Sequence, residues 1–135
     1  IGDVPDKGYY ATEQAGTDFT GKLTPADSSD DVSWTGASGS SRRAFTVVTD
    51  LASVGNKVAY IIQRMCDQAG AYAAGSTIQC ATSSSKLSTG ASQGSSSYGS
   101  YAITGKAMMY YRITSRIEGP RNTVGYVQSQ VLIEY

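Results

Sequence analysis

The chain has 135 residues, with 11 basic and 11 acidic side chains and a formal net charge of zero. This length is typical of one domain with its own core. The balanced charge provides no bulk field that would attract nucleic acid or an anionic membrane, so we do not expect a nucleic-acid partner. No apolar run approaches the roughly 20 residues of a membrane-spanning helix. The chain begins at Ile1 without a methionine or a recognisable signal peptide, and we expect a processed or trimmed piece.

Residues 1–44 are polar, rich in Gly, Asp, Ser and Thr, and show neither helical nor strand periodicity for long. This composition predicts a loop-rich region laid over a sheet. We expect four aromatic side chains to anchor it to the core: Tyr9, Tyr10, Phe19 and Trp34.

Residues 45–66 are predicted to form a β-hairpin. The segment alternates and is rich in β-branched residues, first from Phe45 onwards and again from Lys57. The intervening "SVGN" at 53–56 has turn composition. In the second strand we place Val58, Tyr60 and Ile62 on one face.

Residues 67–106 are predicted to be irregular. Cys66 and Cys80 enclose a stretch of small residues, and "ATSSSKLSTGASQGSSSYGSY" at 81–101 has the composition of a flexible loop. A close, even pair of cysteines in a chain with a secreted-looking surface indicates one disulfide in an oxidising compartment. The alternative is two reduced cysteines in a cytosolic core.

Residues 107–135 form the most regular segment, predicted to be a closing hairpin that turns at 118–122. Each strand has an apolar and a polar side, as in an antiparallel sheet wetted on one face. The apolar sides carry Met109, Tyr111, Ile113 and Ile117 on the first strand and Val127, Val131 and Ile133 on the second. The polar sides carry Tyr110, Arg112, Thr114 and Arg116 on the first strand and Tyr126, Gln128 and Gln130 on the second.

The residues for common catalytic chemistry are largely absent. The chain has no histidine, which excludes Ser-His-Asp and Cys-His catalysis and histidine-based zinc sites. The acidic cluster Asp27, Asp30 and Asp31 is predicted to be a solvated loop; a calcium site is the weaker alternative, and a carboxylate-only enzyme is weaker still. Five arginines (Arg42, Arg43, Arg112, Arg116 and Arg121) are predicted to be ordinary surface residues rather than a nucleic-acid stripe. We expect neither an enzyme nor a cofactor.

The closing hairpin "YYRITSRIEGPRNTVGYVQSQV" resembles the C-terminal signature of PilX-type type IV pilus assembly proteins, and "VAYIIQRMC" at 58–66 is similar to the strand before that family's first cysteine. Together these segments cover about a third of the chain. The matching hairpin residues are Tyr111, Arg112, Ile113, Thr114, Arg116, Gly119, Asn122, Val124, Val127, Gln128 and Ser129.

The resemblance implies an α+β, pilin-like fold for the whole protein. In that family a long N-terminal helix packs on a four-stranded antiparallel sheet. The visible residues 1–135 would be a single, mostly β globular domain that lacks this helix, and Cys66 and Cys80 would suit the family's disulfide. No cysteine lies near Tyr135, so a major-pilin loop closed by a C-terminal cysteine is not expected. We expect the Met109–Ile117 face to be covered by the missing helix in the full-length protein, and here by a second copy or by the N-terminal third.

The resemblance also implies a function. It predicts a non-enzymatic minor pilin that takes part in type IV pilus initiation and is incorporated at the tip. Its partners would be other minor pilins, the major pilin and a tip-associated adhesin. It would lie in the inner membrane with a periplasmic domain before assembly, and in the cell-surface pilus afterwards. The alternative is a secreted surface- or carbohydrate-binding adhesin domain that uses Tyr98 and Tyr101.

Overall fold

The computed structural model describes residues 1–36, 42–47, 55–73, 75–84 and 107–134. In chain order the elements are η1 (Pro5–Lys7), β1 (Tyr9–Tyr10), β2 (Phe45–Val47), β3 (Lys57–Arg64), β4 (Thr82–Ser84), β5 (Ala107–Gly119), η3 (Pro120–Asn122) and β6 (Thr123–Glu134). The two helical elements in these ranges are short 3-10 turns, and neither has the length or hydrophobicity of a membrane span. The described part of the chain is mostly β, as the sequence predicts.

The six strands form one mixed sheet. β5 lies at its centre, with β6 along one edge and β3 and β4 along the other. On its far side β3 pairs with β2 in antiparallel and with β1 in parallel orientation. The four predicted strands are present and antiparallel. The sheet has two further strands, β1 and β4, so the prediction of a four-stranded sheet is wrong. They are only two and three residues long, too short to produce a recognisable alternation.

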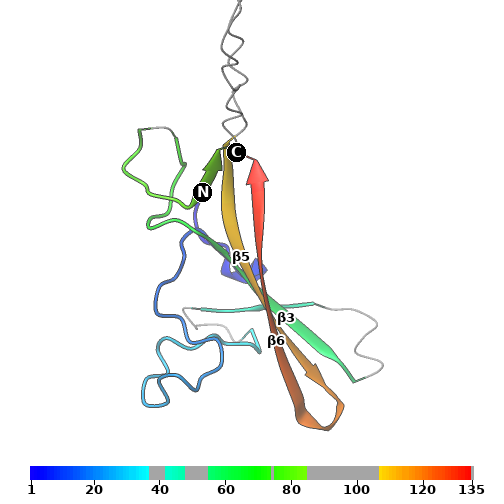
Figure 1. Ribbon diagram of the computed structural model, residues 1–135. Helices are drawn as coiled ribbons and strands as arrows, with labels where there is room; N and C mark the ends of the chain where they lie inside the picture. Colours follow the sequence, from blue (N-terminus) through cyan, green and yellow to red (C-terminus); the bar gives the residue numbers. More distant parts are fainter. Residues whose placement is uncertain (37–41, 48–54, 74, 85–106, 135) are drawn as a thin grey trace, which may run out of the picture.

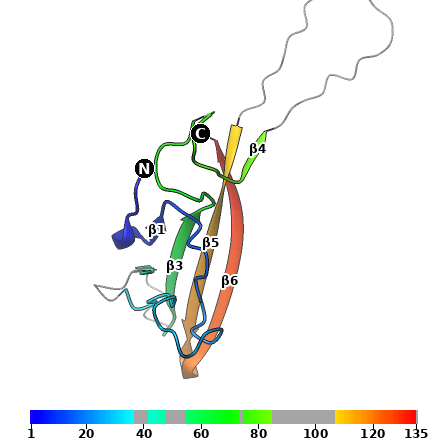
Figure 2. The same cartoon turned by 90° about the vertical axis from the view of Figure 1, so that its left-hand side faces the viewer.

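The closing hairpin is confirmed. β5 and β6 pair without a bulge from Met108↔Glu134 to Gly119↔Thr123. Figures 1 and 2 show the two strands running side by side over their whole length. Arg121 and Asn122 take the left-handed conformation in the turn, with φ of 63° and 59°. Asparagine tolerates this conformation better than most residues.

The hairpin of β2 and β3 is also confirmed over its described residues, with Phe45 opposite Tyr60 and Val47 opposite Val58. Gly8 lies in close contact with this hairpin. Its φ is +65°, and a Cβ there would lie 2.6 Å from the main-chain oxygen of Tyr60 and 2.9 Å from the nitrogen of Phe45. Only glycine therefore lets the chain approach β2 and β3 this closely.

The core lies between the sheet and the N-terminal third. It is formed by buried Tyr10, Val32, Ala44, Ala59 and Ile61, with Phe19 and Trp34 packed against them. The Tyr10 hydroxyl donates a hydrogen bond to the main-chain oxygen of Arg43 at 3.1 Å. Tyr10, Phe19 and Trp34 are thus anchors that the sequence predicts, whereas Tyr9, half-buried like Phe19 and Trp34, is not part of this core cluster.

The predicted disulfide between Cys66 and Cys80 is present and encloses 13 residues. Asp67 reinforces the base of this loop. Its main-chain nitrogen donates to the oxygen of Gln79 at 2.9 Å, and its Oδ1 accepts from the nitrogen of Gln79 at 2.7 Å. Residues 85–106, which hold most of the Ser/Gly-rich segment with Tyr98 and Tyr101, lie outside the described ranges.

Candidate functional site

The two faces of the sheet differ in what lies over them. Directly paired residues of neighbouring strands point to the same face, so the register assigns every side chain. We call one side the covered face; it carries Ala59, Ile61, Gln63, Arg112, Thr114, Arg116, Tyr126 and Gln128. We call the other the open face; it carries Val58, Tyr60, Ile62, Ile113, Ile117, Val127, Ser129 and Val131.

The covered face holds the N-terminal third through polar contacts. Arg112 donates from Nη2 to the main-chain oxygen of Glu13 and from Nε to Oε1 of Gln63, both at 2.9 Å. Its guanidinium also lies 5.6 Å from the centre of the Phe19 ring. These contacts place Arg112 at the junction of the sheet and the N-terminal segment.

Trp34 makes a second junction nearer the hairpin turn. Its indole nitrogen donates to the main-chain oxygen of Phe19 at 2.8 Å. Its ring meets that of Tyr126 edge-to-face, with 5.8 Å between the centres. Trp34 therefore links two parts of the N-terminal segment and also contacts β6.

This arrangement corrects the prediction that the Arg112 side of the hairpin is wetted, and the expectation that the N-terminal third folds over the Ile113 side. The N-terminal third lies along one side of the sheet in Figures 1 and 2, and its Glu13 accepts a hydrogen bond from Arg112. The physical reason is hydrogen bonding. An irregular segment has main-chain groups that need partners when they are covered, and Arg112 donates to one of them, the main-chain oxygen of Glu13.

The open face is the candidate interaction surface. Val58, Tyr60, Ile62 and Ile113 on this face are half-buried. Further along, Ile117 and Val127 are 38% and 57% exposed. On the covered face, by contrast, Ala59, Ile61 and Thr114 are all buried. The disulfide loop lies against the upper end of this face, where buried Arg64 bonds to Gln68 and Gly70 and buried Met109 contacts Cys66. The apolar surface left open is the lower part, on β5 and β6. Contiguous exposed apolar surface of this kind commonly marks a site of association.

Arg64 holds the end of β3 to the disulfide loop, a role that the sequence did not reveal. It is 1% exposed, and its Nε donates to the main-chain oxygen of Ala11 at 3.0 Å. Its terminal nitrogens donate to the oxygens of Gly70 at 2.8 Å and Gln68 at 3.1 Å. The sequence around Arg64, two residues before Cys66, does not indicate that main-chain oxygens of two separate loops lie next to its side chain.

Asp18 organises the loop that holds the acidic cluster. Its Oδ1 accepts from Thr20 and Gly21, and its Oδ2 from Leu23 and Thr24. Burial raises the pKa of Asp18, but these hydrogen bonds to the carboxylate outweigh it and lower the pKa to about 2. Asp18, Thr20 and Gly21 in "DFTG" have turn composition, a signal that the sequence-based predictions did not use.

The predicted acidic cluster does not converge on one point. Oδ1 of Asp27 accepts from Ser29, which lowers the pKa of Asp27, while Oδ2 of Asp30 accepts from Thr24 at 2.7 Å. Burial and the nearby charge of Asp18 raise the pKa of Asp31. Within the described ranges no three acidic or cysteine side chains are grouped as metal ligands.

The arginines are distributed rather than gathered in a stripe. Arg43 forms an ion pair with Asp6 and Arg116 with Glu118, while Arg42 donates to the main-chain oxygen of Ser29 at 2.8 Å. Arg121 lies in the exposed hairpin turn. The two ion pairs fit the predicted surface arginines balanced by acids.

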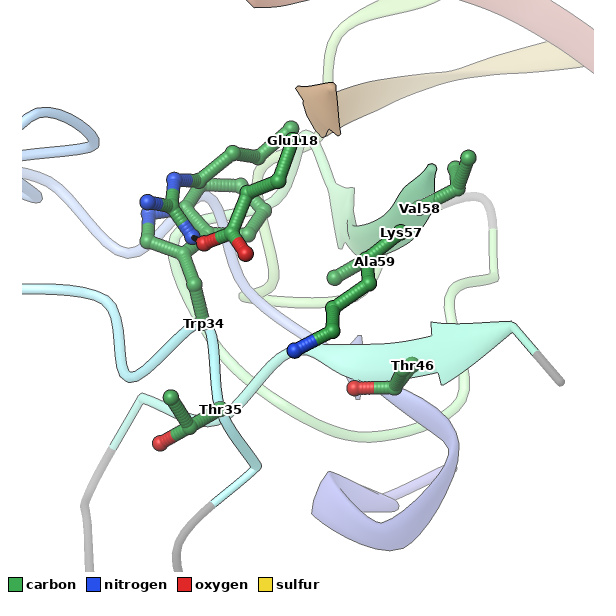
Figure 3. Close-up of a pocket in the computed structure, with 8 residues that line it drawn as sticks. Trp34, Thr35, Thr46, Lys57, Val58, Ala59 and Glu118 are labelled. Carbon is green, nitrogen blue, oxygen red and sulfur yellow. Dashed lines mark hydrogen bonds and ion pairs between the residues drawn. The ribbon is translucent and has the colours of Figure 1, made fainter. Parts of the chain in front are cut away.

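A cleft of about 260 Å³ lies at the lower end of the covered face. Figure 3 shows Trp34 and Thr35 of the N-terminal segment on one side of it, with Lys57 and Glu118 projecting from the sheet. Its lining holds one carboxylate, Glu118, which is paired with Arg116. Carboxylate-based glycoside hydrolysis uses two. The cleft is therefore a weaker candidate site than the open face.

The signature residues of the hairpin serve three structural purposes. Arg112, Thr114, Arg116 and Gln128 lie on the covered face, and Ile113, Val127 and Ser129 on the open face. Gly119 and Asn122 form the turn: a Cβ on Gly119 would lie 2.5 Å from Oγ1 of Thr123. Fold and site thus define a mostly β domain that presents one apolar sheet face. No family model, curated protein or solved structure matches the chain.

Proposed function

We propose that this chain is the globular domain of a PilX-type minor pilin, a non-enzymatic subunit that takes part in the assembly and initiation of type IV pili. The observation that carries the proposal is the open face. In the proposed full-length protein a long N-terminal helix packs on that face and completes an α+β, pilin-like fold. The hairpin signature and the disulfide between Cys66 and Cys80 support the same assignment.

The open face has suitable dimensions for one helix. Neighbouring strands lie about 4.8 Å apart, so β3, β5 and β6 together present a surface about 10 Å wide. A helix with its side chains has a diameter of about 10–12 Å. Apolar side chains occur on all three strands, for example Ile62, Ile113 and Val127. A helix with one apolar stripe would bury them while the covered face keeps its N-terminal segment.

The proposal also assigns partners and a location. The helix would hold the subunit in the inner membrane with this domain in the periplasm. It would then join other minor pilins and the major pilin at the pilus tip, where a tip-associated adhesin is a further partner. The cell surface is therefore the final location of the domain.

The test is made in the bacterium that encodes the chain. Deleting the gene should sharply reduce the number of surface pili seen by electron microscopy, and the wild-type gene should restore them. Antibodies to this domain should label pilus tips. Normal numbers of pili, together with absence of the protein from the sheared pilus fraction, would overturn the proposal. Normal pili with lost binding to a surface would instead favour the adhesin alternative.

A further inference from the structure

β6 forms an edge of the sheet. Within the described ranges it pairs only with β5, and it is the right-hand strand in Figure 2. It is 12 residues long, and nearly all of its residues are exposed. Its outer edge therefore presents a long row of main-chain groups.

The orientation of these groups follows from hydrogen bonds on the other side of β5. Tyr110 donates to the main-chain oxygen of Ala81 at 3.0 Å and accepts from the nitrogen of Met65 at 3.1 Å. Its main-chain groups thus point away from β6. Because such groups alternate along a strand, Ile113 points its groups toward β6 and bonds with Ser129, its partner. The residues of β6 whose groups point outward are the alternate ones: Val124, Tyr126, Gln128, Gln130, Leu132 and Glu134.

Except for Glu134 at its end, this edge lacks the features that natural sheets use against strand association. Those features are short strands, prolines, charged side chains and bulges. From Thr123 to Ile133 the strand has neither a proline nor a charged side chain. Its pairing with β5 is unbroken by a bulge. The edge is therefore chemically suited to pair with a further strand.

The sequence of β6 indicates which strand would pair with this edge. The segment "VQSQV" at Val127–Val131 reads the same in both directions, and Tyr126 and Leu132 extend it with large apolar side chains. An antiparallel pair of identical strands around a two-fold axis matches each residue with its mirror position. We propose that β6 is a homodimer interface, at which two copies of this chain join edge to edge about an axis through Ser129.

In this pair each side chain meets a suitable neighbour. Val127 lies opposite Val131 of the other copy, and Gln128 opposite Gln130. The outward-pointing groups of Gln128 and Gln130 exchange main-chain hydrogen bonds. The two Ser129 residues form a non-hydrogen-bonded pair, in which the Cα atoms lie about 4.5 Å apart. Serine is small enough for that approach, and no like charges oppose each other between Thr123 and Ile133.

The pairing also extends the open face. Val127, which is 57% exposed, then lies opposite Val131 of the second copy, and Ile133, which is 50% exposed, lies opposite Gly125. The two sheets then form one continuous sheet. This interface uses the edge of β6 and leaves the width of the open face free. It does not depend on the proposed pilus function, so either proposal can fail alone.

Cysteine cross-linking of the 135-residue chain tests the axis. Ser129→Cys places two thiols on the axis, within the 4.4–6.8 Å separation of Cα atoms that a disulfide requires. The matched control is Val127→Cys, also on the open face of β6. Its two copies would lie four residues apart along the strands, about 14 Å. Under mild oxidation Ser129→Cys should form covalent dimers at least about tenfold faster than Val127→Cys. Equal rates would overturn the proposal.

Charge and backbone variants test the same edge in solution, by sedimentation across a range of concentrations. Ser129→Lys and Ser129→Glu should each be monomeric, and an equimolar mixture should restore the dimer. Gln130→Pro removes only an outward N–H and should also be monomeric, whereas Gln130→Thr keeps that group and should dimerise. Circular dichroism confirms that each variant is folded. A monomeric wild-type chain, or a dimer that survives Ser129→Lys, would refute β6 pairing.

Discussion

Arg112 of β5 donates a hydrogen bond of 2.9 Å to the main-chain oxygen of Glu13, which lies 99 positions earlier in the chain. A single side chain thus joins two segments that are far apart in the sequence. The same guanidinium reaches Gln63 and the ring of Phe19. The N-terminal segment is therefore fixed to the sheet by polar contacts as much as by its aromatic anchors.

Replacing this arginine should detach the segment in part. We expect Arg112→Ala to lower the free energy of unfolding by about 1–2 kcal/mol, because hydrogen bonds from a charged group to Glu13 and Gln63 are lost. Lys22→Ala, in an exposed loop, should change it by less than about 0.5 kcal/mol. Urea unfolding followed by tryptophan fluorescence measures both, since Trp34 lies in the segment. Equal effects of the two substitutions would contradict the assigned role of Arg112.

Gly8 should be far less replaceable than a glycine with the same backbone conformation in open space. Gly16→Ala, at φ +77° with no atom within 4 Å, should cost about 1 kcal/mol from backbone strain alone. Gly8→Ala adds a collision with the main chain of Tyr60 and Phe45, and should cost at least about 3 kcal/mol. Thermal unfolding of the two variants gives the comparison. Similar losses would mean that Gly8 does not approach β2 and β3 closely.

The closing hairpin was predictable in detail because its alternation is long and uninterrupted. Ile113 and Arg112 fall on opposite faces, and Gly119 and Asn122 mark the turn. Alternation separates two faces but does not say which one another segment covers. The covered side was therefore assigned wrongly: the partners of Arg112 are main-chain oxygens, which every sequence has and no sequence pattern marks.

Short-range polar organisation was equally hard to predict. Asp18 is one acid among several in residues 1–44. Its role depends on a folded loop in which main-chain nitrogens between Thr20 and Thr24 donate to its carboxylate. The same holds for Arg64, whose partners come from Ala11 and from the disulfide loop. The disulfide itself was predictable, because two closely spaced cysteines in a secreted-looking chain have few other uses.

Two acids of one loop should affect stability in opposite directions. The pKa of Asp18 is lowered on folding, so its carboxylate stabilises the fold above its ordinary pKa of 3.8, and this contribution is lost as the pH falls toward 2. Asp18→Asn should therefore destabilise the protein at pH 7, with a difference from wild type that narrows between about pH 4 and pH 2.

Asp31 should behave in the opposite way. Its pKa is raised by burial and by Asp18, so its charged form destabilises the fold above that raised value, and the effect disappears below 3.8. Asp31→Asn should stabilise the protein at pH 7. The gain should shrink in an Asp18→Asn background, which removes one of the repelling charges. Urea midpoints measured from pH 7 to pH 2 test both residues; a gain of stability from Asp18→Asn at neutral pH would contradict this account.

The disulfide should contribute substantially to stability. Closing a loop of this length restricts the unfolded chain and is worth about 3 kcal/mol by chain entropy. Intact-mass measurement with alkylation should detect two thiols only after reduction. The Cys66→Ser, Cys80→Ser double variant should unfold at a clearly lower urea concentration. Two free thiols in the untreated protein would contradict the observed link.

The open face provides a test that depends on whether a helix is attached. In the 135-residue chain Ile113 is half-buried with one side toward solvent, so Ile113→Asp should cost only about 1–2 kcal/mol of lost apolar burial. With the proposed N-terminal helix attached, the same charge would be enclosed between helix and sheet, and the cost should rise to several kcal/mol. Leu23→Asp, in an exposed loop, should have little effect in either form. Urea unfolding of both forms decides the matter: an equal cost of Ile113→Asp with and without the helix would mean that the helix does not pack on this face.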